Sequence, residues 1–297
     1  MQQLNIVQLS QSPMQFDGVY RLCACQHRIA RTGKSYLRLT IEDATGSMIA
    51  YAWQQPDEQL SGVCGTHLHL CGKSRYYNGI YVADILSAEP INPLPDQSLA
   101  TLPSTQCPVP KALAAFTEMV LNIQHDGLRC LLISTFAQEH IALPFLQVPA
   151  SLRYHHNFQG GLLVHSVECA HIIRDLSIFS QQDRELGIAA ALLHDLGKIK
   201  TIGIDFSRPE LGKAIDHEAI TLELCASALV QLDCDFPALA IDLRHILTCR
   251  SIKRWGHEAR HPVAHALQLA DRLSSDNSLH RAPNRNGGQQ QKMIAQA

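Results

Sequence analysis

The feature that most constrains the fold is a change in the spacing of apolar residues partway along the chain. Residues 14–92 alternate apolar and polar side chains, which is the pattern of β-strands with one buried face. Turn signals containing glycine interrupt the alternation at residues 31–34 and 44–46. Five short strands at hairpin spacing within about 80 residues predict a small barrel.

From Lys111 onward, apolar residues recur every three or four positions, which is the pattern of helices that bury one face. Between the two patterns, residues 90–110 hold six prolines and no apolar period, which predicts a semi-rigid linker. The helices are predicted at 111–123, 127–138, 162–176, 186–196, 217–232, 237–249 and 262–274. The domains are predicted as a barrel at 1–92, a linker at 93–110, an all-α domain at 111–280 and a flexible tail at 281–297.

Histidine is the residue type whose distribution points to chemistry. The chain has 297 residues and 16 histidines, of which five lie in residues 1–148 and eleven in 149–297. Because histidine is the commonest metal ligand and the usual general acid or base, the second half is the expected site of chemistry. The formal net charge of −2 excludes binding of nucleic acid by bulk charge alone, so any basic surface must be local.

The cysteines and the N-terminus bear on the expected compartment. Ten cysteines are scattered without a C-x-x-C pair, which argues against a zinc ribbon. The first residues lack the basic and apolar regions of a signal peptide. The longest apolar stretch, Leu186–Leu193, is too short to span a membrane. We therefore expect a cytoplasmic protein with free thiols and no membrane partner.

A histidine and an aspartate lie at the end of a very apolar segment. The sequence AAALLHDLGK (Ala189–Lys198) reads as a buried helix, yet it contains His194 and Asp195. A buried carboxylate costs several kcal/mol unless it is paired or coordinates a metal ion. Asp195 either pairs with a lysine or arginine while His194 is a core histidine, or the two belong to a polar site.

Two more polar residues lie on the apolar faces of predicted helices. His165 follows Leu162 on one helix, and Asp271 follows Leu267 and Ala270 on another. Packed helices can bring such side chains to one ion, and two imidazoles with two carboxylates suit a borderline or hard divalent metal. We expect a divalent ion, with Mn²⁺ first and Fe²⁺, Mg²⁺, Zn²⁺ or Ni²⁺ as alternatives.

At these residues the chain resembles the HD-domain metal-dependent phosphohydrolases. The segments HHNFQGGLLVHSVE, AALLHDLGK, DHEAI, RHILTC and LADRLSS resemble the HD domain of YhaM-type 3′→5′ exoribonucleases. In that family an N-terminal OB-fold precedes the HD domain, and the strand-rich first 90 residues here resemble such a fold. The resemblance implies a five-stranded OB-fold barrel followed by an all-α HD domain.

The resemblance also implies roles for individual residues. Asp195 and Lys198 would be catalytic, with Lys198 neutralising a phosphate oxygen. His155 and His156 would bind substrate at the start of the glycine-containing helix. The implied ligands of the first metal ion are His165, His194, Asp195 and Asp271, and those of a second ion are His217 and His245.

The sequence departs from the family near the second ion. Where the family often carries a His-His pair, four residues after His245, this chain has Cys249 and Arg250. Arg250 would bind phosphate, and Cys249 would suit a softer metal. The number of ions is therefore left open between one and two.

Basic and aromatic residues are interleaved around two turns of the predicted barrel. Arg31, Lys34, Tyr36 and Arg38 surround one turn, and Tyr76 and Tyr77 lie near the other. Single-stranded nucleic acid requires positive charge for its phosphates and ring faces for its bases. These residues are predicted to bind substrate; the alternative is an ordinary hairpin with solvated charges and core tyrosines.

The leading hypothesis is a metal-dependent phosphodiesterase that degrades single-stranded nucleic acid, RNA rather than DNA, from the 3′ end to nucleoside monophosphates. One alternative is an HD-type nucleotide phosphohydrolase acting on free or cyclic nucleotides. Another is a non-catalytic nucleic-acid-binding adaptor. The expected partner is single-stranded nucleic acid, and a homo-oligomer is compatible with the sequence.

Overall fold

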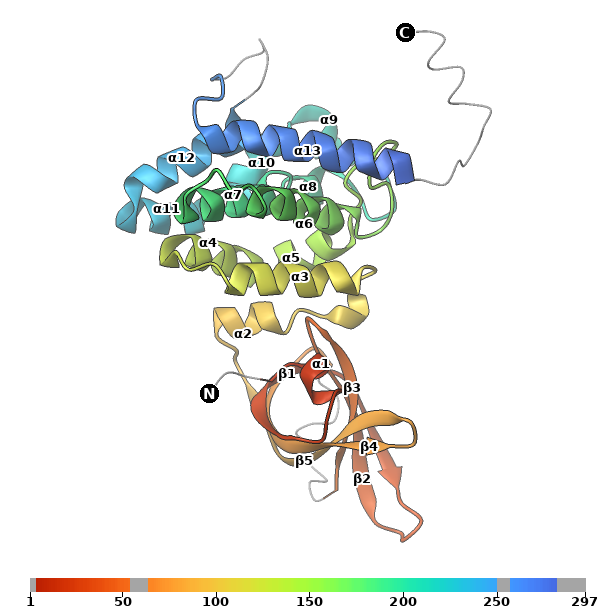
Figure 1. Ribbon diagram of the computed structural model, residues 1–297. Coiled ribbons are helices and arrows are strands. Elements are labelled where there is room, and N and C mark those ends of the chain that lie inside the picture. Colours follow the sequence, from red (N-terminus) through yellow and green to blue (C-terminus); the bar gives the residue numbers. More distant parts are fainter. Residues whose placement is uncertain (1–3, 54–63, 250–256, 282–297) are drawn as a thin grey trace. The chain divides into compact units, whose positions relative to one another are not determined.

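The computed structural model describes residues 4–53, 64–249 and 257–281, apart from the side chain of Arg281 (Figure 1). The chain divides into two compact units. The first comprises residues 1–147 with 222–241, and the second comprises 148–221 with 242–297. Within the described residues, no helix combines the length and the apolar character needed to cross a membrane.

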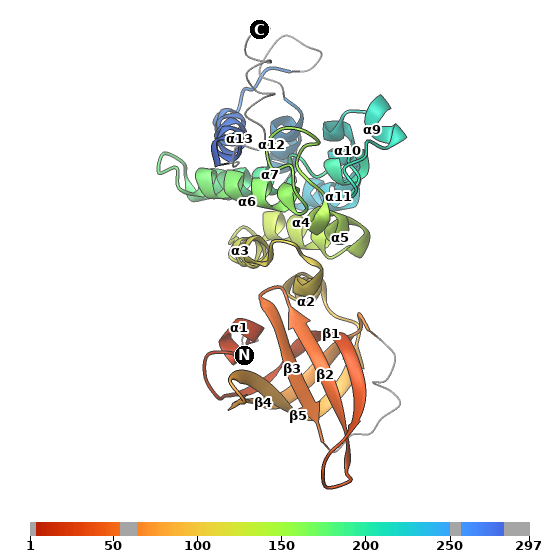
Figure 2. The same cartoon turned by 90° about the vertical axis from the view of Figure 1, so that its right-hand side faces the viewer.

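The N-terminal part of the first unit is a closed five-stranded barrel, as predicted. Its strands are β1 (Gln15–Ile29), β2 (Ser35–Asp43), β3 (Gly46–Ala52), β4 (His67–Tyr77) and β5 (Ile80–Ile91). The order around the barrel is β1-β2-β3-β5-β4, and only β3 and β5 pair in parallel. The hairpin of β1 and β2 extends beyond the barrel wall (Figure 2). This is the OB-fold expected from the sequence.

The alternation in the sequence sorts each strand into an inner and an outer face. Leu37, Leu39 and Ile41 of β2 are fully buried in the barrel, while their neighbours Tyr36 and Arg38 face outward. The short helix α1 (Ile6–Leu9) adds Ile6 and Leu9 to the barrel core. Asp43 holds α1 against the β2–β3 turn, because its carboxylate accepts hydrogen bonds from the backbone N–H groups of Ile6 and Thr45.

The connection between β4 and β5 is a tight hairpin. Strand β4 continues to Tyr77, and β5 runs from Ile80 to Ile91. Only Asn78 and Gly79 form the turn, and both have positive φ. An Asn-Gly pair suits a two-residue hairpin turn, whose twist matches that of the strands. The hairpin carries Arg75, Tyr76 and Tyr77 on paired strand.

The first unit also contains helices. They are α2 (Pro95–Ala100), the 3₁₀ helix η1 (Ser104–Gln106), α3 (Pro110–Leu121), α4 (Asp126–Phe136), α5 (Glu139–Gln147) and α11 (Ala226–Asp235). The proline-rich segment thus forms α2 and η1 rather than a bare linker, and Pro95 and Pro110 start helices because proline suits the first turn. Whether 92 and 110 are domain boundaries stays a prediction.

The second unit is helical. Its elements are α6 (Gly161–Arg174), α7 (Gln181–Leu193), α8 (Lys198–Thr201), α9 (Glu210–Ala214), the N-terminal part of α10 (His217–Leu224), the C-terminal part of α12 (Pro237–Thr248) and α13 (Pro262–Arg281). Helices α6, α7 and α13 pack against one another, with α7 buried through its Ala-Ala-Ala-Leu-Leu end (Figure 1). The single helix predicted at 217–232 is instead two, α10 and α11, which meet at Cys225. The chain therefore turns soon after His217.

Candidate metal centre and nucleic-acid face

Asp195 lies at the centre of a group of polar side chains in the second unit. It follows α7 and is 4% exposed. Its Oδ2 lies 2.5 Å from Lys198 Nζ and 3.5 Å from both His165 Nε2 and His194 Nε2. Its Oδ1 lies 3.0 Å from His217 Nε2. The structure thus brings together five of the residues that the sequence singled out.

Asp271 of α13 reaches the same centre through His165. His165 of α6 is fully buried, and its Nε2 lies 3.2 Å from Asp271 Oδ1. Helices α6 and α13 and the turn that follows α7 therefore each contribute a polar side chain to one point. Burial alone would raise the pKa of Asp195, but the positive charge of Lys198 and the neighbouring His194 hold it well below its usual value.

A glycine lets the polypeptide approach this centre closely. A Cβ at Gly197, next to the His-Asp doublet, would lie 2.0 Å from the carbonyl oxygen of His217. The N–H of Gly197 donates to Thr221 Oγ1 at 2.8 Å, which ties α10 to the same turn. Only a residue without a side chain permits this contact. The glycine of HDLGK therefore helps to place His217 beside Asp195.

A chain of hydrogen bonds determines which nitrogen of His165 carries the proton. The Ser274 hydroxyl donates to Glu168 Oε2 at 2.8 Å, so its oxygen is left to accept from His165 Nδ1 at 3.0 Å. Burial lowers the pKa of His165, which favours the neutral ring. The Nε2 atom then presents a lone pair to the carboxylates of Asp195 and Asp271.

A hydrogen bond also determines which nitrogen of His194 carries a proton. Its Nδ1 lies 2.8 Å from the carbonyl oxygen of Ala191, which can only accept, so Nδ1 donates. Its Nε2 is buried and has no hydrogen-bond partner among the described residues. Lys198 supplies one positive charge to Asp195, but the histidine nitrogens still face the carboxylates of Asp195 and Asp271. A divalent cation among these donors would bind all of them at once. This donor set fits a divalent metal ion held by nitrogen and oxygen.

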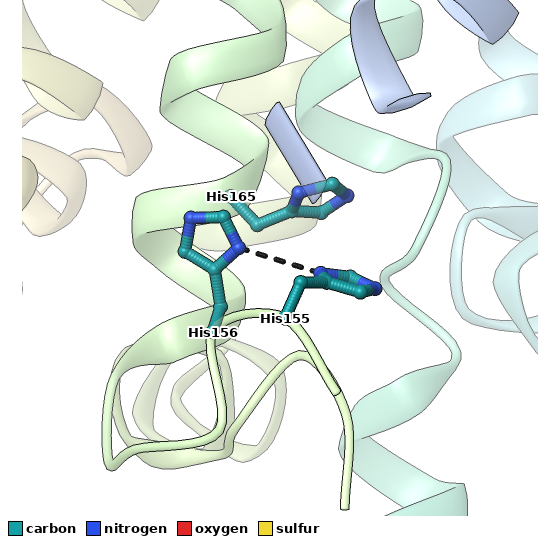
Figure 3. A group of neighbouring side chains, drawn as sticks. All are labelled: His155, His156 and His165. Atoms are coloured by element: carbon teal, nitrogen blue, oxygen red, sulfur yellow. Dashed lines mark hydrogen bonds between the residues drawn. The ribbon is translucent and has the colours of Figure 1, made fainter. Parts of the chain in front are cut away.

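His155 and His156 lie beside His165 (Figure 3). Their Nδ1 atoms are 3.3 Å apart, and the ring centroids are 4.9 Å and 5.2 Å from that of His165. His156 is 3% exposed, and its φ of 48° is strained for a non-glycine residue. Its Nε2 lies 3.1 Å from Glu168 Oε2, the same oxygen that accepts from Ser274.

These contacts determine whether the His155 ring carries a positive charge. Burial, with the nearby His165 and Lys198, lowers the pKa of His155 to about 4. The ring is therefore neutral near pH 7 and offers a lone pair or an N–H rather than a positive charge. A ligand atom from each of His155, His156 and His165 lies within 4.8 Å of the others, so these residues could also hold an ion.

His245 has a different environment. Its Nε2 accepts a hydrogen bond from the backbone N–H of Arg260 at 3.1 Å. Among the described residues no ion pair joins His245 to Asp195, so its role as a second-ion ligand stays a prediction. Cys249 donates to the carbonyl oxygen of Ile246 at 3.6 Å. Arg250 lies outside the described residues.

A pocket of about 650 Å³ opens beside the centre. Lys198 and His217, both in contact with Asp195, form part of its wall. The wall also includes Arg153, Tyr154 and Arg208, which the sequence pattern did not single out. A volume of this size suits a ligand as large as a nucleotide.

The barrel carries a face of stacked aromatic rings. Tyr36 of β2 stacks on Trp53 with centroids 4.7 Å apart, and Tyr51 of β3 stacks on Trp53 at 5.7 Å. Trp53 is 46% exposed, and its Nε1 donates to Asp84 Oδ1 at 3.0 Å. The predicted Tyr36 and Arg38 are therefore joined by Tyr51, which pairs with Arg38, and by Trp53.

The other predicted barrel residues lie on the β4–β5 hairpin and in the β1–β2 turn. The guanidinium of Arg75 pairs with Asp84 and lies 4.8 Å from the ring centroid of Tyr77. Tyr76 is 62% exposed and contacts Tyr81 edge-on. Arg31 and Lys34 are exposed in the turn between β1 and β2. Exposed rings with cations beside them offer base stacking and phosphate contacts.

Comparison with known proteins agrees with this arrangement. The family model described as HD domain matches residues 162–276. A 3′-5′ exoribonuclease YhaM of Shouchella clausii is 27% identical over 90% of this chain and 85% of its own length. Proteins of the same name are 24% identical in Bacillus subtilis, over 77% of this chain and 74% of theirs, and 27% identical in Listeria innocua, over 76% and 74%.

Among solved structures, a murine DNA-binding protein bound to double-stranded DNA aligns with this chain. The alignment covers 31% of this chain and 49% of the murine protein. The TM-score is 0.27 and the identity 13%, which does not show a shared fold.

Proposed function

We propose that this chain, which carries an HD domain and is homologous along most of its length to proteins named 3′-5′ exoribonuclease YhaM, is a metal-dependent 3′-5′ exonuclease of single-stranded RNA. The observation that supports it most is the donor set around Asp195. Histidine lone pairs and carboxylates from three helices face one another there, beside a pocket of nucleotide size.

His165, His194, Asp195 and Asp271 would hold the metal ion, with Mn²⁺ as the proposed metal. His217 is the proposed contact to a second ion through its approach to Asp195. A bound divalent metal lowers the pKa of water and polarises a phosphoryl oxygen. The hydrogen bonds of Glu168 and Ser274 hold the His165 ring in the tautomer that such a site requires.

The pocket residues would position the end of the strand. Lys198 lies within reach of both Asp195 and the pocket, so its ammonium can neutralise a phosphate oxygen as charge accumulates. Tyr154 is 63% exposed and offers a ring face to the terminal base. Arg153 and Arg208 offer guanidinium groups to the neighbouring phosphates.

The barrel would hold the strand that leads away from the cleavage site. Its stacked rings provide sequence-tolerant contacts, which suits an enzyme that must pass successive nucleotides. The basic residues Arg31, Lys34 and Arg38 would contact phosphates, and His155 and His156 would contact the scissile end. Ten free cysteines fit a reducing compartment, and a cytoplasmic location is part of this proposal.

The test uses the full chain with Mn²⁺ and a 5′-labelled RNA that has a single-stranded 3′ end. We expect successive shortening from the 3′ end with release of nucleoside monophosphates. Asp195→Asn should lower the rate more than about 100-fold, because it removes the charge around which the centre is built.

The matched control is Asp276→Asn, because Asp276 is an exposed aspartate of α13 and should retain full activity. Three outcomes would contradict the proposal. Cleavage of free nucleotides but not of RNA would indicate a nucleotide phosphohydrolase. Tight RNA binding without cleavage in any divalent metal would indicate an adaptor. Equal activity of Asp195→Asn and wild type would place the chemistry elsewhere.

A further inference from the structure

A second group of metal-ligating side chains lies on the outer surface of the barrel, in the first unit. Asp17 is on β1, and His69 and Cys71 are two residues apart on β4. Asp17 pairs with Cys71 across the β1–β4 ladder. Leu68 and Leu70 point into the barrel core, so the alternating His69 and Cys71 point outward on the same face as Asp17.

The three side chains are in mutual contact. His69 Nε2 lies 2.7 Å from Asp17 Oδ1, and Cys71 Sγ donates to Asp17 Oδ2 at 3.1 Å. One ligand atom from each residue lies within 4.8 Å of the others. Tetrahedral Zn²⁺, with bonds of about 2.0–2.3 Å, requires ligand atoms about 3.3–3.7 Å apart, so small side-chain shifts complete the geometry.

The strand register places one more carboxylate beside these three side chains. Glu89 of β5 pairs directly with His69 and is exposed on the same outer face. Residues opposite each other in a ladder have Cβ atoms about 5 Å apart, so the Glu89 carboxylate can reach the ion. Among the described residues, no lysine or arginine forms an ion pair with Asp17. The carboxylates are therefore available to compensate a cation.

We propose that Asp17, His69 and Cys71, with Glu89 as the fourth ligand, form a binding site for a borderline divalent transition metal, Zn²⁺ first, that is separate from the HD centre. A set of one nitrogen, one sulfur and two oxygen atoms suits Zn²⁺ or Co²⁺ rather than the harder Mg²⁺ or Mn²⁺. On binding, the Cys71 thiol gives its proton to solvent and the thiolate coordinates the ion. The ion would join β1, β4 and β5.

A reactive cysteine is a weaker explanation of the same group. The Ser87 hydrogen bond lowers the pKa of Cys71, but the hydrogen bond to Asp17 and the charge of the two carboxylates raise it overall. The free protein thus holds a thiol rather than the thiolate that a nucleophile needs. A bound divalent cation would neutralise these carboxylates and so favour the Cys71 thiolate as a ligand.

The first experiment titrates Co²⁺ into metal-free full-length protein and follows the thiolate-to-Co²⁺ charge-transfer absorption. Wild type should show this absorption, and Cys71→Ser should lose it. Cys64→Ser is the matched control, because Cys64 is an exposed thiol of the first unit outside this group and should leave the absorption unchanged. The HD centre has a thiol of its own, because Cys169 Sγ lies 3.9 Å from His165 Nε2. Absorption that survives in Cys71→Ser but disappears in Cys169→Ser would therefore belong to the HD centre and overturn the proposal.

The second experiment locates the ligand directly. Zn²⁺ should protect Cys71 from alkylation, measured by peptide mass spectrometry, while Cys64 stays reactive. His69→Gln should weaken this protection by about tenfold or more in Zn²⁺ concentration. Protection that is unchanged in His69→Gln, or absent in wild type at saturating Zn²⁺, would overturn the site. Neither result depends on nuclease activity, so failure here leaves the proposed function intact.

Discussion

The proposed metal centre around Asp195 and the aromatic face of the barrel hold their side chains by opposite means. In the centre, buried hydrogen bonds fix His165, His194 and Glu168 before any ligand arrives. On the barrel face, half-exposed rings such as Trp53 support one another by stacking. A buried polar network fails when one member is removed, whereas a stacked surface loses affinity by degrees. Single substitutions should therefore have large effects in the centre and graded effects on the face.

The largest effect is expected at Asp271. Asp271→Asn removes one of the two carboxylates that face the His165 lone pair, so affinity for Mn²⁺ and the rate of RNA cleavage should each fall more than about 100-fold. Equilibrium dialysis and single-turnover cleavage measure the two quantities. The exposed Asp276 of the same helix should tolerate the same substitution. Near-normal metal affinity of Asp271→Asn would show that the centre is not a single cooperative network.

The next prediction concerns the hydrogen bonds that orient the proposed ligand His165. Ser274→Ala removes the acceptor for His165 Nδ1, so the ring no longer has to present its Nε2 lone pair. We expect affinity for Mn²⁺ to fall about 10- to 100-fold. Ser166→Ala is the matched control, because Ser166 is also buried in this unit and its hydroxyl has no partner among the described residues.

The two serine variants separate positioning from packing. Both remove one buried hydroxyl, so a purely structural role would change thermal stability in both and metal affinity in neither. An equal loss of affinity in Ser166→Ala and Ser274→Ala would argue against the tautomer explanation. Normal folding of both is checked by circular dichroism.

A graded effect is expected on the barrel face. Trp53→Ala removes the ring that Tyr36 and Tyr51 share, so binding of single-stranded RNA should weaken by about 1–2 kcal/mol, or roughly 5- to 30-fold in Kd. Fluorescence anisotropy with a labelled oligonucleotide measures this. Leu86→Ala, which removes an exposed apolar side chain of β5 outside the stack, should leave Kd unchanged.

Salt dependence distinguishes the rings from the cations. Trp53→Ala should lower affinity without changing the slope of log Kd against log salt concentration, because it removes no charge. Lys34→Ala should reduce that slope by about 0.7. A change of slope in Trp53→Ala would mean that this substitution alters charge contacts with the phosphates. That result would contradict the explanation of the barrel face as a surface of stacked rings.

The sequence revealed the centre far better than the face. His165, Asp195 and Asp271 could be predicted because a polar residue on an apolar helix face is visible along one chain segment. Glu168 and Ser274 could not, since a glutamate and a serine on helices read as solvated until α6 and α13 are packed together. Their role depends on which side chains meet in three dimensions.

The barrel illustrates the same limit in a different way. Alternation predicted the five strands, but the contribution of Tyr51 and Trp53 depends on the β2–β3 register, which places Tyr51 opposite Arg38. The break between α10 and α11 at Cys225 was missed because the apolar period continues across it. The Asn78-Gly79 turn did carry a sequence signal, since Asn-Gly is the strongest short hairpin motif.

The smallest expected effect concerns acid stability at the edge of the aromatic face. Burial raises the pKa of Asp84, but hydrogen bonds from Arg75 and Trp53 outweigh it and lower the folded-state pKa below the usual 3.8. A depressed pKa contributes stability that is fully present above the unfolded value and is lost as pH falls through the folded value. Asp84 should thus stabilise the barrel above pH 3.8 and progressively less below it.

Because Asp84 and Arg75 are each about one-third exposed, solvent screens this pair and its contribution should be below about 1 kcal/mol. Chemical denaturation of Asp84→Asn should show a small loss of stability at pH 7 that diminishes as the pH is lowered below 3.8. Exposed Asp96 of α2 provides the control substitution, Asp96→Asn. A loss at pH 7 of several kcal/mol would mean that the aromatic face is as tightly coupled as the centre, and a loss that grows toward pH 3 would reverse the sign of the Asp84 contribution.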